Sequence, residues 1–214
     1  MNRLRTSPGV VGARNLVAVL IDLHCHTFPL SQCSSLRPEE LADLARERGI
    51  EGVCLTEHDA AWDADNLAAL NLRTGFLFLA GMELTTDLGH VLAFGLGTGS
   101  ARFASATMLA QAAAAGGALL YLAHPARDGL FRFAEAATTL FASIETQNGS
   151  DTRLQNVAAA GLANAFGLPG IGGSDAHTPA EVGRAATHFE ARITDIASLV
   201  RALRAGKYEA VDLR

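Results

Sequence analysis

The stretch LVAVLIDLHCHT, residues 16–27, joins an apolar run of strand length to two histidines. Residues 16–23 are apolar apart from one aspartate, which predicts a buried strand. His24 and His26 close the run, and alternate residues of a strand point to the same side. Both imidazoles can therefore bind one metal ion, since neutral imidazole is the commonest metal ligand in proteins. The alternative, a histidine pair on an exposed edge strand, fits poorly with so apolar a run.

The rest of the chain repeats this alternation of apolar runs and helix-like segments. In Pro38–Arg48, for example, proline suits the first helical turn and Gly49 ends the helix. Strands alternating with helices predict a largely parallel sheet, and about seven such units predict one α/β domain built as a small, irregular barrel. Chemistry in such barrels sits where strands end. Further strands are expected at residues 52–56, 76–85, 90–95, 118–123, 142–147, 171, 187–191 and 208–211, and further helices at 62–72, 101–115 and 195–204.

One more helix is expected to begin at Asp151, as its N-cap, and to end at Gly167 and Pro169. Its apolar residues recur with helical spacing, which predicts the face that packs on the sheet. That face comprises Leu154, Val157, Ala158, Leu162 and Ala165.

The composition is that of a folded globular protein. The 214 residues are enough for one domain with a substantial core, and 49% of them are hydrophobic. The net charge of −5 argues against a long nucleic acid partner, whereas a small anion can still bind at metal ions. Three cysteines, an odd number, fit a reducing cytoplasm better than a disulfide framework. We interpret residues 1–14 as a flexible leader before a domain at 15–214, with no signal peptide and no membrane span.

A second pair of possible ligands lies in GGSDAH, residues 172–177. Asp175 and His177 are again two residues apart, behind glycines that permit close backbone approach. Taken alone, the segment also fits a turn capped by the aspartate side chain. Beside the first histidine pair, it favours a metal site.

Further candidate ligands follow or occupy other predicted strands. In TEHD, residues 56–59, His58 is the expected ligand, and Asp59 is a second ligand or a partner that fixes the imidazole. Glu57 is interpreted as a loop charge. Glu83 lies late in an apolar strand, where a carboxylate needs either a metal ion or an arginine partner, and the metal is favoured. His90 and His124 complete the candidates.

Cysteine chemistry is the other interpretation of the first motif. Cys25 lies between the two histidines, but alternation along the strand points its thiol away from both. Cys54 is mid-strand and is expected in the core. The sequence has no Walker motif, no GxGxxG after a strand and no GxSxG elbow, so those nucleotide-binding and serine-hydrolase devices are not indicated.

Six motifs taken together resemble the PHP family, the polymerase and histidinol phosphatase domains. Each motif alone is weak, but their order is specific and spans Asp22 to about Phe189. IETQNGS (144–150) resembles the C-terminal part of stand-alone members. The resemblance implies a distorted barrel of seven strand–helix units and two or three divalent metal ions, usually zinc, manganese or iron. The motifs are DLHCHT (22–27), TEHD (56–59), GMELTT (81–86), GHVLAFG (89–95), AHP (123–125) and GGSDAHT (172–178).

The resemblance also implies how the ligands divide among the metals. Family members often place an aspartate or histidine shortly after the first motif to complete the third site, but residues 28–35 offer neither. Cys33 is either its replacement, since zinc accepts thiolate, or a bystander. The implied sets are His24, His26, Glu83 and Asp175 for the first metal, Glu83, His90 and His124 for the second, and His58 and His177 for the third.

The expected function is hydrolysis of a small phosphate ester, either a phosphomonoester or a nucleotide. Two metals ~3.5–4 Å apart would hold a bridging hydroxide as the nucleophile. The expected catalytic residues are Glu83, Asp175 and His177, with Asp175 or a nearby histidine managing the proton. Arg127 and Arg184 are either phosphate clamps or solvated surface arginines.

Alternatives from other classes stay open. One is an amidohydrolase-like enzyme that cleaves an amide or lactone with a similar metal centre. Another is a regulatory PHP module without turnover, which would show eroded ligands, whereas eight of the nine expected ligands are present. A third is a nuclease limited to nucleotides or short oligonucleotides. Nothing in the sequence indicates an oligomeric state.

Overall fold

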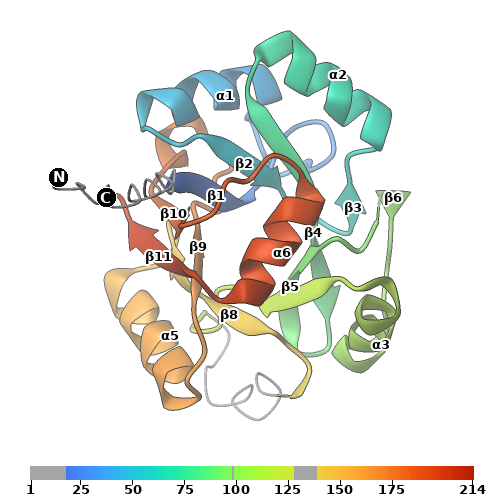
Figure 1. The fold of residues 1–214 in the computed structure, drawn as a ribbon, viewed down its shortest axis with the longest axis vertical. Helices are drawn as coiled ribbons and strands as arrows, with labels where there is room; N and C mark the ends of the chain where they lie inside the picture. Colours follow the sequence, from blue (N-terminus) through green and yellow to red (C-terminus); the bar gives the residue numbers. More distant parts are fainter. Residues whose placement is uncertain (1–17, 98, 128–138) are drawn as a thin grey trace, which may run out of the picture.

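The computed structural model describes residues 18–97, 99–127 and 139–214, and the expected leader at residues 1–14 lies outside them. The described residues form a nine-stranded sheet, a two-stranded ribbon and five α-helices (Figure 1). The predicted elements agree with them to within about five residues at each end. In chain order the elements are β1 (Val19–Cys25), α1 (Pro38–Glu47), β2 (Gly52–Leu55), β3 (Ala60–Ala61), α2 (Ala64–Thr74), β4 (Leu77–Thr86), β5 (Gly89–Phe94), β6 (Gly99–Ser100), α3 (Ala106–Gly116), β7 (Leu119–Leu122), β8 (Ser143–Asn148), α5 (Arg153–Ala165), β9 (Ile171–Gly173), the 3-10 turn η2 (Pro179–Glu181), β10 (Ala185–Phe189), α6 (Ile196–Ala205) and β11 (Tyr208–Asp212).

Seven strands of the large sheet form a nearly closed barrel. Their order is β1-β2-β4-β5-β7-β8-β9, and β10 and β11 extend the sheet beyond β1. The chain after β9 returns to β1, because the Asp175 amide donates to the His24 carbonyl at 2.7 Å and Cys25 bridges Ala176. This closure confirms the predicted single-domain, distorted α/β barrel.

The sheet is mixed, so the prediction of a largely parallel sheet is wrong. Neighbours are parallel in β1-β2, β2-β4, β7-β8 and β8-β9, and antiparallel in the other four pairs. The β4–β5 pair has a local reason: only Asp87 and Leu88 separate the two strands. So short a connection forms a hairpin, since a parallel crossover needs a dozen residues or more.

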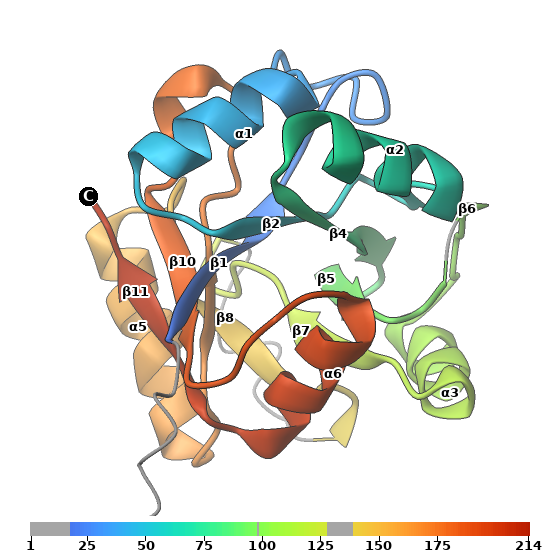
Figure 2. The same cartoon turned by 45° about the horizontal axis from the view of Figure 1, so that its top comes forward.

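The helices cover the barrel on several sides. Figure 2 shows α1 and α2 side by side over β1, β2 and β4, with α5 on the opposite side near β10 and β11. The barrel interior is apolar, and Leu199, Ala202 and Leu203 of α6 belong to the same buried cluster as Ile21, Leu79, Leu92 and Tyr121 of the strands. Helix α6 therefore closes the end of the barrel at which β1, β2 and β4 begin.

Helix α5 is rotated relative to its prediction. Its N-cap is Thr152, not Asp151, and Thr152 forms a capping box with Gln155. Its buried residues are Asn156, Ala159 and Ala163, whereas Leu154 and Val157 of the predicted inner face are 82% and 68% exposed. Two hydrogen bonds explain this rotation of the helix. The Asn156 side chain accepts from the Asn148 amide and donates to the Asn148 carbonyl, each at 3.0 Å. The buried backbone groups at the end of β8 need hydrogen-bond partners, and this need decides which face of α5 turns toward the barrel.

A substitution pair tests this helix orientation. We expect Asn156→Ala to lower the free energy of unfolding by about 1–3 kcal/mol, because it leaves the buried Asn148 amide without a partner, while the Asn148 carbonyl keeps only the Asp151 amide as donor at 3.2 Å. Leu154→Ala, on the exposed face, should change it by less than about 0.5 kcal/mol. Urea unfolding of both variants measures the difference, and the reverse ranking would restore the predicted apolar face.

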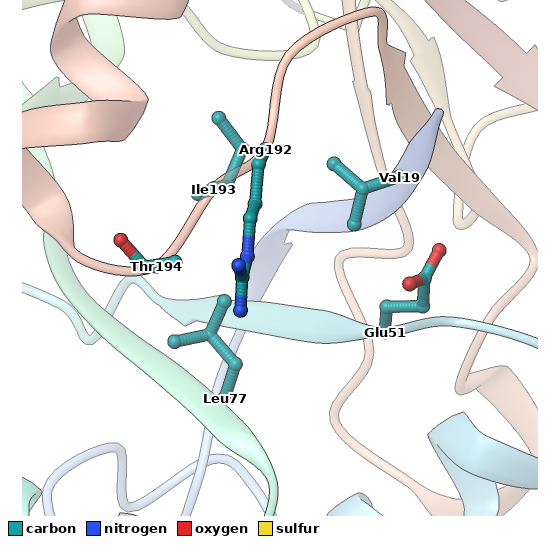
Figure 3. A pocket seen from close by; sticks show the side chains of 6 residues that line it. All are labelled: Val19, Glu51, Leu77, Arg192, Ile193 and Thr194. Atoms are coloured by element: carbon teal, nitrogen blue, oxygen red, sulfur yellow. The ribbon is translucent and has the colours of Figure 1, made fainter. Parts of the chain in front are cut away.

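A surface pocket lies at the amino end of the barrel, beside the loop that leads into α6 (Figure 3). Val19 begins β1, Glu51 precedes β2 and Leu77 begins β4, so these three mark the ends where the strands start. The loop before α6 supplies Arg192, Ile193 and Thr194. None of these six residues is a predicted site residue, and the predicted ligands follow β1 and β2 at the other end. The candidate functional residues therefore lie at the carboxyl end of the barrel.

Candidate metal centre

Glu83 lies at the centre of the carboxyl end of the barrel. It is 1% exposed, and imidazole nitrogens of five histidines surround its carboxylate. The alternative of an arginine partner is therefore wrong among the described residues. Oε1 lies 2.9 Å from His90 Nδ1, 3.0 Å from His124 Nε2 and 3.5 Å from His24 Nε2, and Oε2 lies 3.0 Å from His58 Nδ1 and 3.2 Å from His26 Nε2.

The structure brings all eight predicted metal ligands into one cluster. Four sets of three residues place their donor atoms within 4.8 Å of one another, and within the described chain these sets contain the eight predicted residues and no other. The grouping differs from the implied one, because His124 joins His24 and His90 joins His58. Metal binding by these residues stays a prediction. The sets are His26, His58 and His177; His24, Glu83 and His124; His24, His26 and Asp175; and His58, Glu83 and His90.

A β-bulge turns the first histidine pair inward. Between Asp22 and Cys25 the register with β2 shifts, so that three steps along β1 match two along β2. A bulge re-aims the side chains beside it. His24 and His26 then face each other with 3.1 Å between their Nε2 atoms, while Cys25 packs in the apolar cluster under α1, as expected from alternation. Gly173 lets β9 approach, because a Cβ there would lie 2.4 Å from His24 Cβ.

The second pair, Asp175 and His177, also enters the cluster. Asp175 Oδ1 lies 3.4 Å from the Nε2 atoms of both His24 and His26. The His177 ring stacks on His26 with a centroid distance of 4.4 Å, and its Nδ1 lies 3.0 Å from the Asp175 carbonyl oxygen. The first and last thirds of the chain thus meet at this point.

Backbone strain is concentrated at this cluster. Among the described residues, the non-glycine residues with positive φ are Asp59 (52°), His124 (28°) and Asp175 (51°). Each is held by hydrogen bonds: the Asp59 amide donates to the Glu83 carbonyl at 2.9 Å, and its Oδ1 accepts from the Thr85 amide at 3.0 Å. Such conformations cost about 1–3 kcal/mol each and persist where the surroundings impose them, typically at functional sites. Asp59 therefore fixes β4 beside Glu83 and belongs to none of the four ligand sets.

Two fully buried glutamates complete the surroundings. Glu57 is not the expected loop charge, because it accepts from the Thr27 amide at 2.9 Å, the Ser31 hydroxyl at 2.5 Å and Trp62 Nε1 at 3.0 Å, and it also bonds the Thr27 hydroxyl. Glu145 was not predicted at all. Its Oε1 lies 3.0 Å from His24 Nδ1. The pattern that indicated Glu83, a carboxylate within a predicted buried strand, also applies to Glu145 and could have found it.

The substrate-binding predictions have different outcomes. Arg127 lies beside the cluster and donates to Asp175 Oδ2 at 2.7 Å, Asn148 Oδ1 at 2.8 Å and Asp151. Arg184 follows η2 and packs its Cβ near Gly149, and within the described chain it makes no hydrogen bond or ion pair with the eight cluster residues. Cys33 is exposed and belongs to none of the ligand sets among the described residues. Arg127 is thus better placed than Arg184 to meet a bound anion.

The cluster is a site of strong charge coupling. Burial opposes ionisation of Glu83, but the charge of His24 and hydrogen bonds from His124, His24 and His26 hold its pKa well below the usual value. Burial likewise opposes the charged form of His24, but the carboxylates of Asp175, Glu145 and Glu83 raise its pKa well above the usual value. Carboxylates packed this closely need positive charge beside them, and a divalent cation supplies it.

The residues fit divalent metal ions. Two Nε2 atoms 3.1 Å apart, each on a strand-anchored ring, converge on a common position, as ligands of one cation do. His124 Nδ1 is buried and makes no hydrogen bond within the described chain. Buried polar atoms without a partner are costly, so an additional partner such as a cation is expected there. Imidazole and carboxylate donors suit zinc, manganese and iron.

Comparison with protein families identifies the chain. A barrel with histidines and carboxylates gathered at its carboxyl end belongs to the class of proteins that can hold metal ions there. The family described as PHP domain matches residues 22–168, and the family described as PHP-associated matches residues 153–208. The chain belongs to the PHP domain family. No curated protein matches it by sequence.

Solved structures share the fold at low sequence identity. A two-domain protein from Bacteroides vulgatus containing a predicted PHP-like metal-dependent phosphoesterase has TM-score 0.70 and 20% identity, over 99% of this chain and 70% of that one. An amidohydrolase from Chromobacterium violaceum with bound sulfate and no metal has TM-score 0.64 and 19% identity, over 91% and 98%. An endonuclease Q in complex with a 27-mer duplex carrying an abasic lesion has TM-score 0.64 and 18% identity, over 90% and 58%. The similarity supports the fold and leaves the substrate open.

In the described ranges, none of the helices combines the length and apolar character needed to cross a membrane.

Removal of the central carboxylate tests the metal centre. We expect Glu83→Gln to lose at least one metal ion per chain and to bind the remainder more than ~100-fold more weakly, because outer partners of metal ligands alone contribute about 10–100-fold. Elemental analysis and chelator competition measure both. The matched control is Glu209→Gln, whose carboxylate faces His188 at 3.6 Å on the exposed edge strand β11. Full metal content in Glu83→Gln would contradict the assignment.

Proposed function

We propose that this PHP-family hydrolase is a phosphoesterase that hydrolyses a small phosphate ester, a phosphomonoester or a nucleotide. The observation that carries the proposal is the position of Arg127 beside the cluster. Its Nη2 is fixed by Asn148 and Asp175, while its Nη1 makes no hydrogen bond in the described part of the chain. The side chain is 30% exposed, so an anion can reach it. A fixed guanidinium next to a metal cluster suits the doubly charged oxygens of a phosphate ester.

We propose two or three divalent ions, zinc, manganese or iron, held by the eight cluster residues. When bound, such ions activate water at neutral pH and neutralise charge on a phosphoryl group. The chain's own contribution is rigidity: Glu83 is held by five histidines, and its position on β4 is fixed by Asp59. Eight intact donors argue against a regulatory module without turnover.

Glu83, Asp175 and His177 are the proposed catalytic residues. Asp175 has two distinct oxygens, since Oδ2 accepts from Arg127 while Oδ1 faces His24 and His26. Oδ1 is therefore the atom proposed to bind a metal ion, and Asp175 or a nearby histidine is proposed to accept the proton from attacking water. His177 is half-buried and its Nδ1 faces the Asp175 carbonyl oxygen, which leaves Nε2 for a metal ion or for the leaving group.

The proposed substrate is small, and no long nucleic acid is expected, because the chain carries a net charge of −5. The endonuclease Q neighbour acts on a DNA duplex, and the amidohydrolase neighbour represents non-phosphate chemistry, so both classes enter the test. We also propose a cytoplasmic location, because Cys25, Cys33 and Cys54 are all free thiols.

A substrate panel tests this function. Metal-loaded wild type, Asp175→Ala and Glu209→Gln are assayed with manganese or zinc on phosphomonoesters, nucleotides, cyclic phosphodiesters, a lesion-bearing duplex, an amide and a lactone. We expect wild type and Glu209→Gln to release phosphate from a small ester at equal rates. Asp175→Ala should be at least ~10²-fold slower, as expected for a lost proton-transfer group. Equal activity of Asp175→Ala, or activity confined to the duplex, amide or lactone, would overturn the proposal.

We expect substitution of Arg127 and substitution of Arg184 to change the kinetics to different extents. Arg127→Met should lower kcat/KM for the phosphate ester by about 10–100-fold, since a charge-assisted hydrogen bond contributes about 1.5–3 kcal/mol. Arg184→Met should lower kcat/KM by less than that, because within the described chain Arg184 makes no hydrogen bond or ion pair with the cluster residues. Steady-state kinetics of both variants at saturating metal measures the effects. Unchanged kcat/KM in Arg127→Met would exclude it as the phosphate clamp.

A further inference from the structure

Glu145 is a buried carboxylate that forms no ion pair with an arginine or a lysine among the described residues. It lies in β8, its side chain is fully buried, and it belongs to none of the four ligand sets of the described chain. Its ion-pair partner in that part of the chain is a histidine rather than an arginine or lysine. Burying a carboxylate costs several kcal/mol unless hydrogen bonds satisfy both oxygens. The partners that satisfy Glu145 therefore show what holds it in this place.

Both oxygens of Glu145 are bound to segments that carry metal-ligand candidates. Oε1 lies 3.0 Å from His24 Nδ1 at the end of β1. Oε2 accepts from the backbone amide of His124 at 2.8 Å and from Asn148 Nδ2 at 3.0 Å. His24 and His124 form one ligand set with Glu83. One side chain from β8 thus links two of the three members of that set.

The contact with His24 fixes which ring nitrogen carries a proton. An ionised carboxylate only accepts hydrogen bonds, so Nδ1 of His24 must be the donor. Nε2 is then the nitrogen available to a bound metal ion, and it faces the interior, where Glu83 Oε1, His26 Nε2 and Asp175 Oδ1 lie within 3.5 Å. Ring orientation and tautomer are both set by Glu145.

The contact with His124 fixes a strained backbone. His124 has φ of 28°, outside the range that L residues ordinarily adopt. Its amide is held by Glu145 Oε2, while its Nε2 lies 3.0 Å from Glu83 Oε1. Without the Glu145 acceptor, the backbone of His124 is free to relax toward negative φ, and that relaxation moves the ring away from Glu83.

We infer that Glu145 is a positioning residue that holds His24 and His124 in ligand geometry and thereby sets the affinity of the metal site that they share with Glu83. The inference rests on the proposed metal centre. A carboxylate is required at this position because both oxygens accept hydrogen bonds. Glutamine, of nearly the same shape, offers one acceptor oxygen and cannot serve His24 and His124 together.

The main experiment compares metal affinities by chelator competition with zinc. We expect Glu145→Gln to bind one zinc about 10–100-fold more weakly than wild type, the usual effect of losing an outer partner of a metal ligand. A zinc held by His26, His58 and His177, a set without His24 and His124, should bind with unchanged affinity. Ile144→Val is the matched control, because it lies beside Glu145 on β8, packs in the apolar cluster with α3, and loses one methylene without touching His24. It should lower thermal stability while leaving zinc affinity within about twofold.

A second measurement needs no variant. Long-range ¹H–¹⁵N NMR of zinc-loaded wild type should show His24 protonated at Nδ1 and not at Nε2. Protonation at Nε2, wild-type zinc affinity in Glu145→Gln, or an equal affinity loss in Ile144→Val would each overturn the positioning role. These outcomes differ from failure of the metal centre itself, in which wild type binds no zinc at all and both proposals fall.

Discussion

The burial of one carboxylate among five imidazoles is the constraint on which this structure depends. Glu83 reaches the barrel interior on β4, and the histidines around it come from β1, β5 and the segments after β2 and β7. Such a group cannot stay buried without opposite charge. The strands that meet at Glu83 therefore have to be held in register by their own apolar packing, which the clusters on both sides of the sheet provide.

The apolar residues that stabilise the barrel and the polar residues of the cluster therefore lie at opposite ends of the barrel. Ile21 and Leu23 fill the interior, and α6 closes its amino end with Leu199 and Leu203. The polar groups collect at the opposite end, where bulges in β1 and between β8 and β9 re-aim single side chains. The barrel can thus hold strained residues such as His124, because the energy of the apolar end compensates for them.

The sequence predicted the barrel and the side chains that converge in the cluster, for a physical reason. His24 and His26, or Asp175 and His177, are two residues apart at strand ends, and that spacing is visible without a structure. The roles of Glu57 and Glu145 depend on partners from distant segments, which a local pattern does not contain. The rotation of α5 was mispredicted for the same reason, since the contact of Asn156 with the Asn148 backbone outweighs the apolar spacing of Leu154 and Val157.

The closing contact between β1 and the segment after β9 has a consequence for biosynthesis. His24 leaves the ribosome early, whereas Asp175 and His177 follow only after most of the chain has been made, and the amide of Asp175 must find the carbonyl of His24 before the cluster exists. A nascent chain that ends before β9 has an open sheet edge and an incomplete set of donors. The two donor sets that contain Asp175 or His177 are therefore completed only when the last third of the chain has been made.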